Sequence, residues 1–210
     1  MKKIITVALV GVLAFRSIGL GSEPPKQVKA VIGAATCSGL LSAREFSTKV
    51  LSPSELPLLK KDIQEHGWIA EIPGLESALM SNYPAEIGVH EKSGFRLAIH
   101  YSGEKIMVLS CSVPLVNGDQ KEQKQMIETM LAATEALVGK DTGARRWLDT
   151  EWQRAWEMSA KLFEKESIDQ KELIRKKEFG PFLVTVWGVV PDIVFLNCVR
   201  RANPERSVAR

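Results

Sequence analysis

The sequence predicts an α+β fold in which one mainly antiparallel sheet of about five strands carries helices on one face. Three observations predict this two-layer sandwich. Residues 85–113 alternate between apolar and polar side chains in segments separated by short turns, which indicates an antiparallel meander. Residues 119–179 show the apolar spacing of helices, and residues 182–199 are again rich in strand-forming residues. Strands and helices are thus grouped along the chain, and one layer of each buries every apolar face.

The composition is that of a soluble globular protein. Of the 210 residues, 45% are hydrophobic and 25% are charged, which excludes wholesale disorder. We divide the chain into four parts. These are a signal peptide at residues 1–21, a leader and poorly defined N-terminal segment at 22–50, a single α+β domain at 51–200 and a basic tail at 201–210.

The start of the chain has the features of a secretory signal peptide. Two lysines follow Met1, and 12 apolar or small residues run from Ile4 to Phe15. Gly19 and Gly21 then supply small residues at the spacing that a signal peptidase recognises. We therefore expect a periplasmic or secreted protein that has no membrane contact after cleavage. The alternative is an uncleaved membrane anchor, whose apolar stretch would have to include Arg16.

We expect cleavage after Gly21, so that the mature chain begins at Ser22. The intact mass of the protein recovered from the exported fraction measures this directly. A mass that still includes residues 1–21 would contradict the signal-peptide assignment and support the anchor.

The first part of the mature chain has weaker signals. We expect a helix somewhere within residues 28–50, a second helix within 54–66, a short strand at 68–72 and a brief helical piece at 75–80. The second helix is predicted from leucines and an isoleucine spaced three and four residues apart, which end at a glycine.

The first hairpin of the meander carries a register prediction. Its apolar residues have odd numbers on both strands, and a three-residue loop at 92–94 pairs Val89 with Leu97 and Ile87 with Ile99. These four side chains are expected to form the core face. The opposite face is expected to be polar and solvated, and its residues are Glu86, His90, Arg96 and His100. A third strand at 106–113 completes the meander.

Three helices are expected after the meander. Asp119 followed by Glu122 resembles a capping box, and the helix that it opens ends at residue 139. A second long helix begins near residue 142, and a third, shorter helix is expected from residue 167 to just before residue 180.

Two strands at residues 182–190 and 193–199 close the domain, and both are apolar on both faces. Helices cover only one side of the predicted sheet, so the other apolar set, which includes Trp187, needs a cover. We expect the N-terminal segment up to Val50 to lie over it. The alternative is an exposed patch that docks a partner or a second copy of the chain.

No catalytic or cofactor motif stands out in the sequence. The serines have neither a nucleophile-elbow nor an S-x-x-K context, and no glycine-rich phosphate loop is present. We therefore name no catalytic, cofactor-binding or metal-ligating residue and no cofactor. Tryptophans at 147, 152 and 156 could form a ligand platform, but helical spacing favours the core for Trp152 and Trp156 and leaves Trp147 off the apolar stripe.

The three cysteines, Cys37, Cys111 and Cys198, allow at most one internal disulfide in an oxidising compartment. Cys111 and Cys198 both lie in strand-like segments, where a free thiol is a common small apolar residue. The sequence leaves open whether any pair is bridged. Neither these cysteines nor the three histidines have metal-ligand spacing.

Charge excludes one class of partner. The net charge is +3, but residues 1–21 hold three basic residues and no acid, so the remainder has 25 of each sign. A balanced chain has no overall field that attracts nucleic acid. We therefore expect a non-enzymatic binding or interaction module that docks another envelope or extracellular protein. The alternatives are a small exported hydrolase with an unrecognised site and a membrane-anchored accessory protein; the partner, the oligomeric state and whether the protein is an enzyme stay open.

Overall fold

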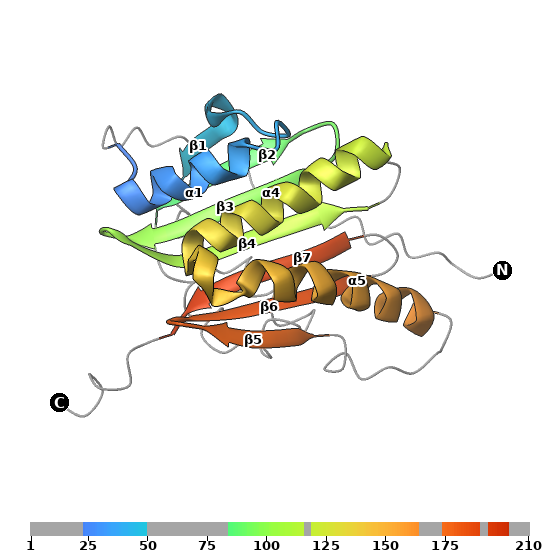
Figure 1. The fold of residues 1–210 in the computed structure, drawn as a ribbon. Coiled ribbons are helices and arrows are strands. Elements are labelled where there is room, and N and C mark those ends of the chain that lie inside the picture. The colour runs from blue at the N-terminus through green and yellow to red at the C-terminus, as the bar shows by residue number, and fades with distance from the viewer. Residues whose placement is uncertain (1–22, 50–83, 116–118, 164–173, 190–192, 202–210) are drawn as a thin grey trace, which may run out of the picture.

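The computed structural model describes residues 23–49, 84–115, 119–163, 174–189 and 193–201. In these residues one antiparallel sheet of seven strands, in the order β1-β2-β3-β4-β7-β6-β5, carries the helices α1, α4 and α5 on one face (Figure 1). The predicted α+β class is confirmed. The strands are β1 (Phe46–Lys49), β2 (Ala85–His90), β3 (Phe95–Ser102), β4 (Lys105–Pro114), β5 (Arg175–Phe179), β6 (Phe182–Val189) and β7 (Ile193–Arg200). The helices are α1 (Lys26–Thr36), α4 (Gln120–Val138) and α5 (Ala144–Phe163), with 3-10 turns η1 (Ala43–Glu45) and η3 (Lys140–Thr142).

The sheet has two more strands than the sequence predicts, and both are its short edges, β1 and β5. The prediction that the third helix extends to residue 179 is wrong, since residues 175–179 form the strand β5. An edge strand lacks the alternation that reveals a central one, and in β5 only Phe179 is buried. The earlier part of that helix, at 167–173, lies outside the described residues.

Other expectations also fall outside the part of the chain that the structure describes. These are the signal peptide at 1–21, the helices within 54–66 and 75–80 and the strand at 68–72. The helix expected within residues 28–50 is present as α1, which packs against α4.

The register predicted for the first hairpin is wrong by one residue. His90 pairs with Phe95 and Gly88 with Leu97, and the loop has four residues, closed by a hydrogen bond of 2.9 Å from the Gly94 amide to the His90 carbonyl. A one-residue shift turns every β2 side chain to the other face. Glu86 and His90 therefore lie on the helix side with Gly88, whereas Ile87 and Val89 lie on the opposite side.

Packing above β2 explains this register. A Cβ atom on Gly88 would lie 2.8 Å from the Phe46 ring and 3.1 Å from Leu41. Phe46 and Leu41 thus supply the apolar cover at this edge of the helix layer, and only glycine leaves room for them. An isoleucine or valine could not occupy that position.

The helix layer and the sheet enclose the core. α4 packs on β4, α5 packs on β6, and both helices contact each other. Asp119 caps α4, because its side chain accepts a hydrogen bond of 3.0 Å from the Lys121 amide. The Glu122 side chain, expected to complete a capping box, instead lies beside His90 and Lys92. The core residues that are at most 1% exposed include Phe95, Leu97, Ile99, Leu109, Met126, Met130, Leu148 and Leu196. Within the described ranges, no helix combines the length and apolarity needed to cross a bilayer.

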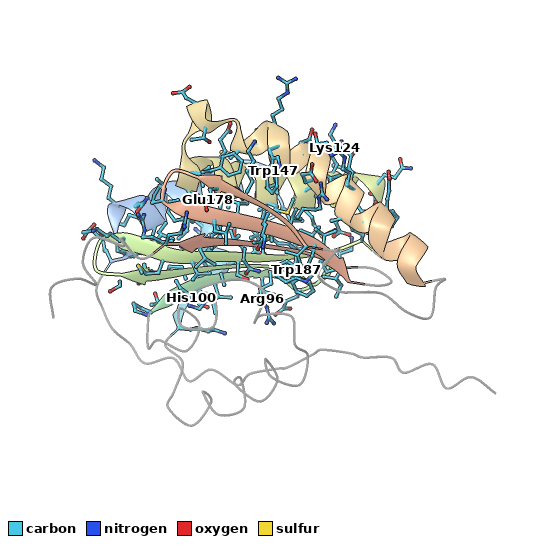
Figure 2. All side chains as sticks on the ribbon, turned by 90° about the horizontal axis from the view of Figure 1, so that it is seen from below. Arg96, His100, Lys124, Trp147, Glu178 and Trp187 are labelled. Carbon is cyan, nitrogen blue, oxygen red and sulfur yellow. The ribbon has the colours of Figure 1, made fainter. Side chains whose placement is uncertain are left out.

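The sheet face away from the helices, here called the second face, is not simply a solvated surface. Figure 2 shows His100, Arg96 and Trp187 on this side and Trp147 on the helix side. Arg96 is exposed as expected, but His100 is only 7% exposed, so its prediction as a solvated residue is wrong. Other buried residues of the second face are Val108, Thr185, Trp187, Asn197 and Val199. The N-terminal segment does not cover this face in residues 23–49, because α1 lies in the helix layer and β1 in the sheet (Figure 1).

Candidate functional site

The cavity with the most distinctive chemistry lies between α5 and the edge strand β5, and we call it the α5–β5 cavity. It has a volume of about 280 Å³ and is lined by Trp147, Glu151, Ile174, Arg175 and Lys176. Trp147 and Glu151 are four residues apart on α5, so they occupy the same side of the helix. The cavity therefore combines one aromatic side chain with a carboxylate and a guanidinium, and Lys176 belongs to the strand at its border.

Glu151 binds two arginines at this cavity. Its side chain is 7% exposed and accepts hydrogen bonds of 2.9 Å from Arg154 Nη1 and 2.7 Å from Arg175 Nε. A carboxylate so deeply buried requires charged partners to offset the loss of hydration. The Glu151–Arg175 pair ties α5 to β5, and it holds the Arg175 guanidinium at the cavity in one orientation.

Trp147 forms the apolar wall. Its ring packs against Phe179 with centroids 5.6 Å apart and planes tilted by 58°, a favourable aromatic geometry. Lys177 Nζ lies 5.4 Å from the centroid of the same Phe179 ring. The two strand residues thus place a cation and an aromatic ring beside the tryptophan.

Among the residues that the structure describes, the cluster has an excess of positive charge. Arg154, Arg175, Lys176 and Lys177 are opposed by Glu151, while the nearby Glu178 is paired with Arg201. A guanidinium has five N–H donors, and Glu151 engages one from each arginine. The site therefore retains donors and charge that suit a carboxylate or another anion.

A larger open groove of about 500 Å³ lies between α4 and α5, but its charges are balanced. Arg145 Nη2 lies 2.7 and 2.6 Å from the two carboxylate oxygens of Glu128, and Arg145 Nη1 lies 3.6 Å from Glu135. The hydrogen bonds to Glu128, together with the charge of the nearby Glu135, raise the pKa of Arg145. The groove is lined by three acids and three bases together with Leu131 and Gly143. Arg145 therefore serves mainly to join α4 to α5.

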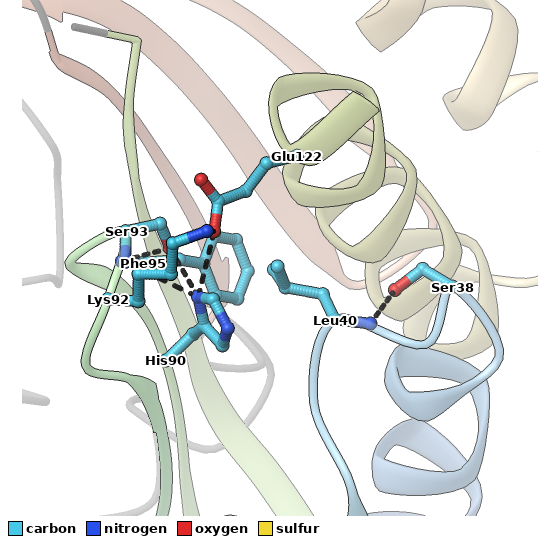
Figure 3. Close-up of polar contacts among 7 residues, drawn as sticks. All are labelled: Ser38, Leu40, His90, Lys92, Ser93, Phe95 and Glu122. Carbon is cyan, nitrogen blue, oxygen red and sulfur yellow. Dashed lines mark hydrogen bonds and ion pairs between the residues drawn. The ribbon is translucent and has the colours of Figure 1, made fainter. Parts of the chain in front are cut away.

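His90 and Ser93 meet at the tip of the first hairpin, beside Glu122 of α4 (Figure 3). Ser93 Oγ lies 2.8 Å from His90 Nδ1, and Glu122 Oε1 lies 3.7 Å from the same nitrogen. A serine nucleophile needs its hydroxyl and its carboxylate on opposite ring nitrogens. This arrangement is therefore no catalytic triad. The Ser93 hydroxyl also accepts a hydrogen bond of 3.3 Å from the Phe95 amide, so the cluster closes the loop.

The residues that the sequence singled out are dispersed. Glu86 is 4% exposed and accepts a hydrogen bond of 2.6 Å from Thr48 Oγ1. It lies in β2, near the edge of the sheet that is opposite to the α5–β5 cavity. Ser38 Oγ lies 2.5 Å from Thr129 Oγ1 and joins the turn after α1 to α4. Ser110 and Ser112 are half-buried in β4. Ser112 pairs with Arg96 of β3, but neither residue lines the α5–β5 cavity.

The burial of the three α5 tryptophans differs in part from the prediction. Trp152 is half-buried against the core, but Trp156 is 37% exposed, so its assignment to the core is wrong. Ala155 occupies the buried position beside it at 0% exposure. Trp147, the tryptophan off the apolar stripe, lines the cavity. The sequence holds one indication of this cavity, because Glu151 is an acid that falls on the buried side of an otherwise amphipathic helix.

The three cysteines are free thiols, with Cys37 exposed and the other two buried. Cys111 pairs with Leu196 and Cys198 with Leu109 on neighbouring strands, so the two are not directly opposite each other. Burial raises the pKa of both thiols, that of Cys198 to about 12. Neither is therefore a reactive thiolate at neutral pH. Across the described ranges, no group of three potential ligands is placed to hold a metal ion.

No protein-family model, no curated protein and no solved structure matched the chain.

Proposed function

We propose that the protein is a non-enzymatic binding module of the cell envelope or exterior, and that it holds an acidic segment of another protein at the α5–β5 cavity. The observation that carries this proposal is the buried Glu151 carboxylate, which fixes Arg175 beside Trp147 in a cluster with excess positive charge. A preoriented guanidinium loses little freedom when it binds a carboxylate, which favours recognition.

The local excess of cations at the α5–β5 cavity supports the proposal because the charges of the chain as a whole are balanced. Outside residues 1–21 the chain has 25 basic and 25 acidic residues, so a local excess of cations is not a consequence of composition. The helix–strand junction also combines charge with an aromatic wall. Arginine and tryptophan are residue types that dominate protein–protein recognition sites.

The proposal is tested with a fluorescently labelled, capped ten-residue peptide of alternating glutamate and threonine, whose binding to the mature chain is followed by anisotropy. We expect saturable binding that Arg175→Gln weakens at least tenfold, because this substitution removes the oriented charge. Binding should also weaken as salt is raised, because the arginines and lysines are partly exposed.

Arg145→Gln is the matched control. Arg145, on α5, is a partly exposed arginine like Arg175, but Glu128 and Glu135 already neutralise it. This variant should bind the peptide as the wild type does. Equal losses in Arg175→Gln and Arg145→Gln, or no binding of the peptide to the wild type, would contradict the proposed function.

A further inference from the structure

The strand that borders the α5–β5 cavity is an edge of the sheet. β5 pairs with β6 on one side, and the structure places no strand on its other side among the residues it describes. The outer edge of such a strand presents backbone N–H and C=O groups that another extended chain can pair with.

β5 carries cations on both of its faces. Arg175 and Lys177 pair with Val186 and Val184, whose side chains point into the core, so both cations lie on the helix side. Lys176 pairs with Thr185 and lies on the second face. Lys176 and Lys177 are both exposed. A strand added beside β5 would therefore meet Arg175 and Lys177 on the helix side, and Lys176 beside the ion pair of Glu178 and Arg201 on the second face.

These charges select what can pair with the edge. Lysines on an edge strand normally prevent association, and like charges placed opposite each other repel. A glutamate placed opposite either of these lysines instead stabilises the pairing. The edge thus discriminates against neutral and basic strands and admits an acidic one.

The edge is continuous with the cavity. Arg175 is the first residue of β5 and also lines the α5–β5 cavity, so a chain that follows β5 reaches the oriented guanidinium. The opposite edge of the sheet differs. β1 has four residues, and Lys49 is its single basic residue.

We propose that the acidic segment binds as an additional β-strand along the outer edge of β5, with one of its carboxylates at Arg175. This inference rests on the proposed function and adds the conformation of the ligand. It commits to an extended acidic segment of a partner protein, recognised by its backbone and by alternating carboxylates.

Two backbone-methylated forms of the glutamate–threonine peptide test strand addition. One is N-methylated at every glutamate and the other at every threonine, so that each loses the N–H donors along one edge of a strand. The side-chain charges remain the same. In an added strand only one edge faces β5, so we expect one form to bind at least tenfold more weakly and the other to keep the affinity of the parent peptide.

The outcomes separate this inference from the proposed function. If the parent peptide binds and both methylated forms are affected equally, strand addition is wrong, while charge recognition at the cavity stands. If the parent peptide does not bind, the proposed function fails as well. A peptide with glutamine in place of glutamate measures the part of the affinity that does not depend on charge.

A charge exchange tests the selectivity of the edge. The variant Lys176→Glu/Lys177→Glu should bind the acidic peptide at least tenfold more weakly, because both substituted side chains are exposed and bring like charges to the edge that receives the peptide. If this variant binds the acidic peptide as tightly as the wild type does, with an unchanged circular dichroism spectrum and unfolding midpoint, the lysines do not select the partner.

Discussion

Replacing Leu97 by alanine is expected to lower the free energy of unfolding by about 2–5 kcal/mol. Leu97 is 0% exposed and lies between Gly88 of β2 and Cys111 of β4 on the helix side of the sheet. The substitution removes buried methyl groups from the centre of the core and leaves a cavity that the packed helices cannot fill. Denaturant unfolding of the two proteins measures the difference.

Two neighbouring substitutions make this result a test of register. Arg96→Ala should change stability by no more than about 0.5 kcal/mol, because Arg96 is exposed on the second face. Ile87→Ala should cost clearly less than Leu97→Ala, since Ile87 lies on the second face and is half-buried. A loss for Ile87→Ala as large as that for Leu97→Ala would support the three-residue loop and contradict the pairing of Gly88 with Leu97.

Acid is expected to destabilise the protein through His100. This residue is 7% exposed, and its burial lowers the pKa of the imidazole from 6.5 to about 4. The unfolded chain therefore binds a proton at a pH at which the folded protein does not. The stabilisation that a neutral His100 provides is complete above pH 6.5 and is lost as the pH falls from 6.5 to about 4. The pKa change corresponds to about 3 kcal/mol.

The difference between wild type and His100→Gln isolates this effect from other acid-labile groups. We expect the stability advantage of the wild type to shrink by about 3 kcal/mol when unfolding is measured at pH 7 and again at pH 4. His90→Gln, a change at a less buried histidine in the hairpin loop, should leave the pH dependence in place. Parallel pH curves for wild type and His100→Gln would show that His100 is accessible in the folded protein.

The predicted elements that were confirmed depend on information local to each segment. The alternation in residues 95–101, the cap at Asp119 and the apolar stripe of α4 all follow from the period of a strand or a helix. The α+β class then follows because these elements bury their apolar faces in only a few ways. The candidate site was not predictable in this manner, since Glu151 and Arg175 come from different elements and meet through packing.

The sequence by itself determined the order and type of the central elements and the single helix-covered face of the sheet, because hydrophobic periodicity is written within each segment. Only the tertiary structure decided the facing of β2, where Phe46 and Leu41 occupy the space above Gly88. It also decided that residues 175–179 form a strand, since β5 is supported by its pairing with β6 rather than by its own pattern. Both outcomes depend on contacts between residues distant in sequence. Register and edge pairing depend on the residues that pack against a strand. The alternation of side chains along the strand does not reveal which residues these are.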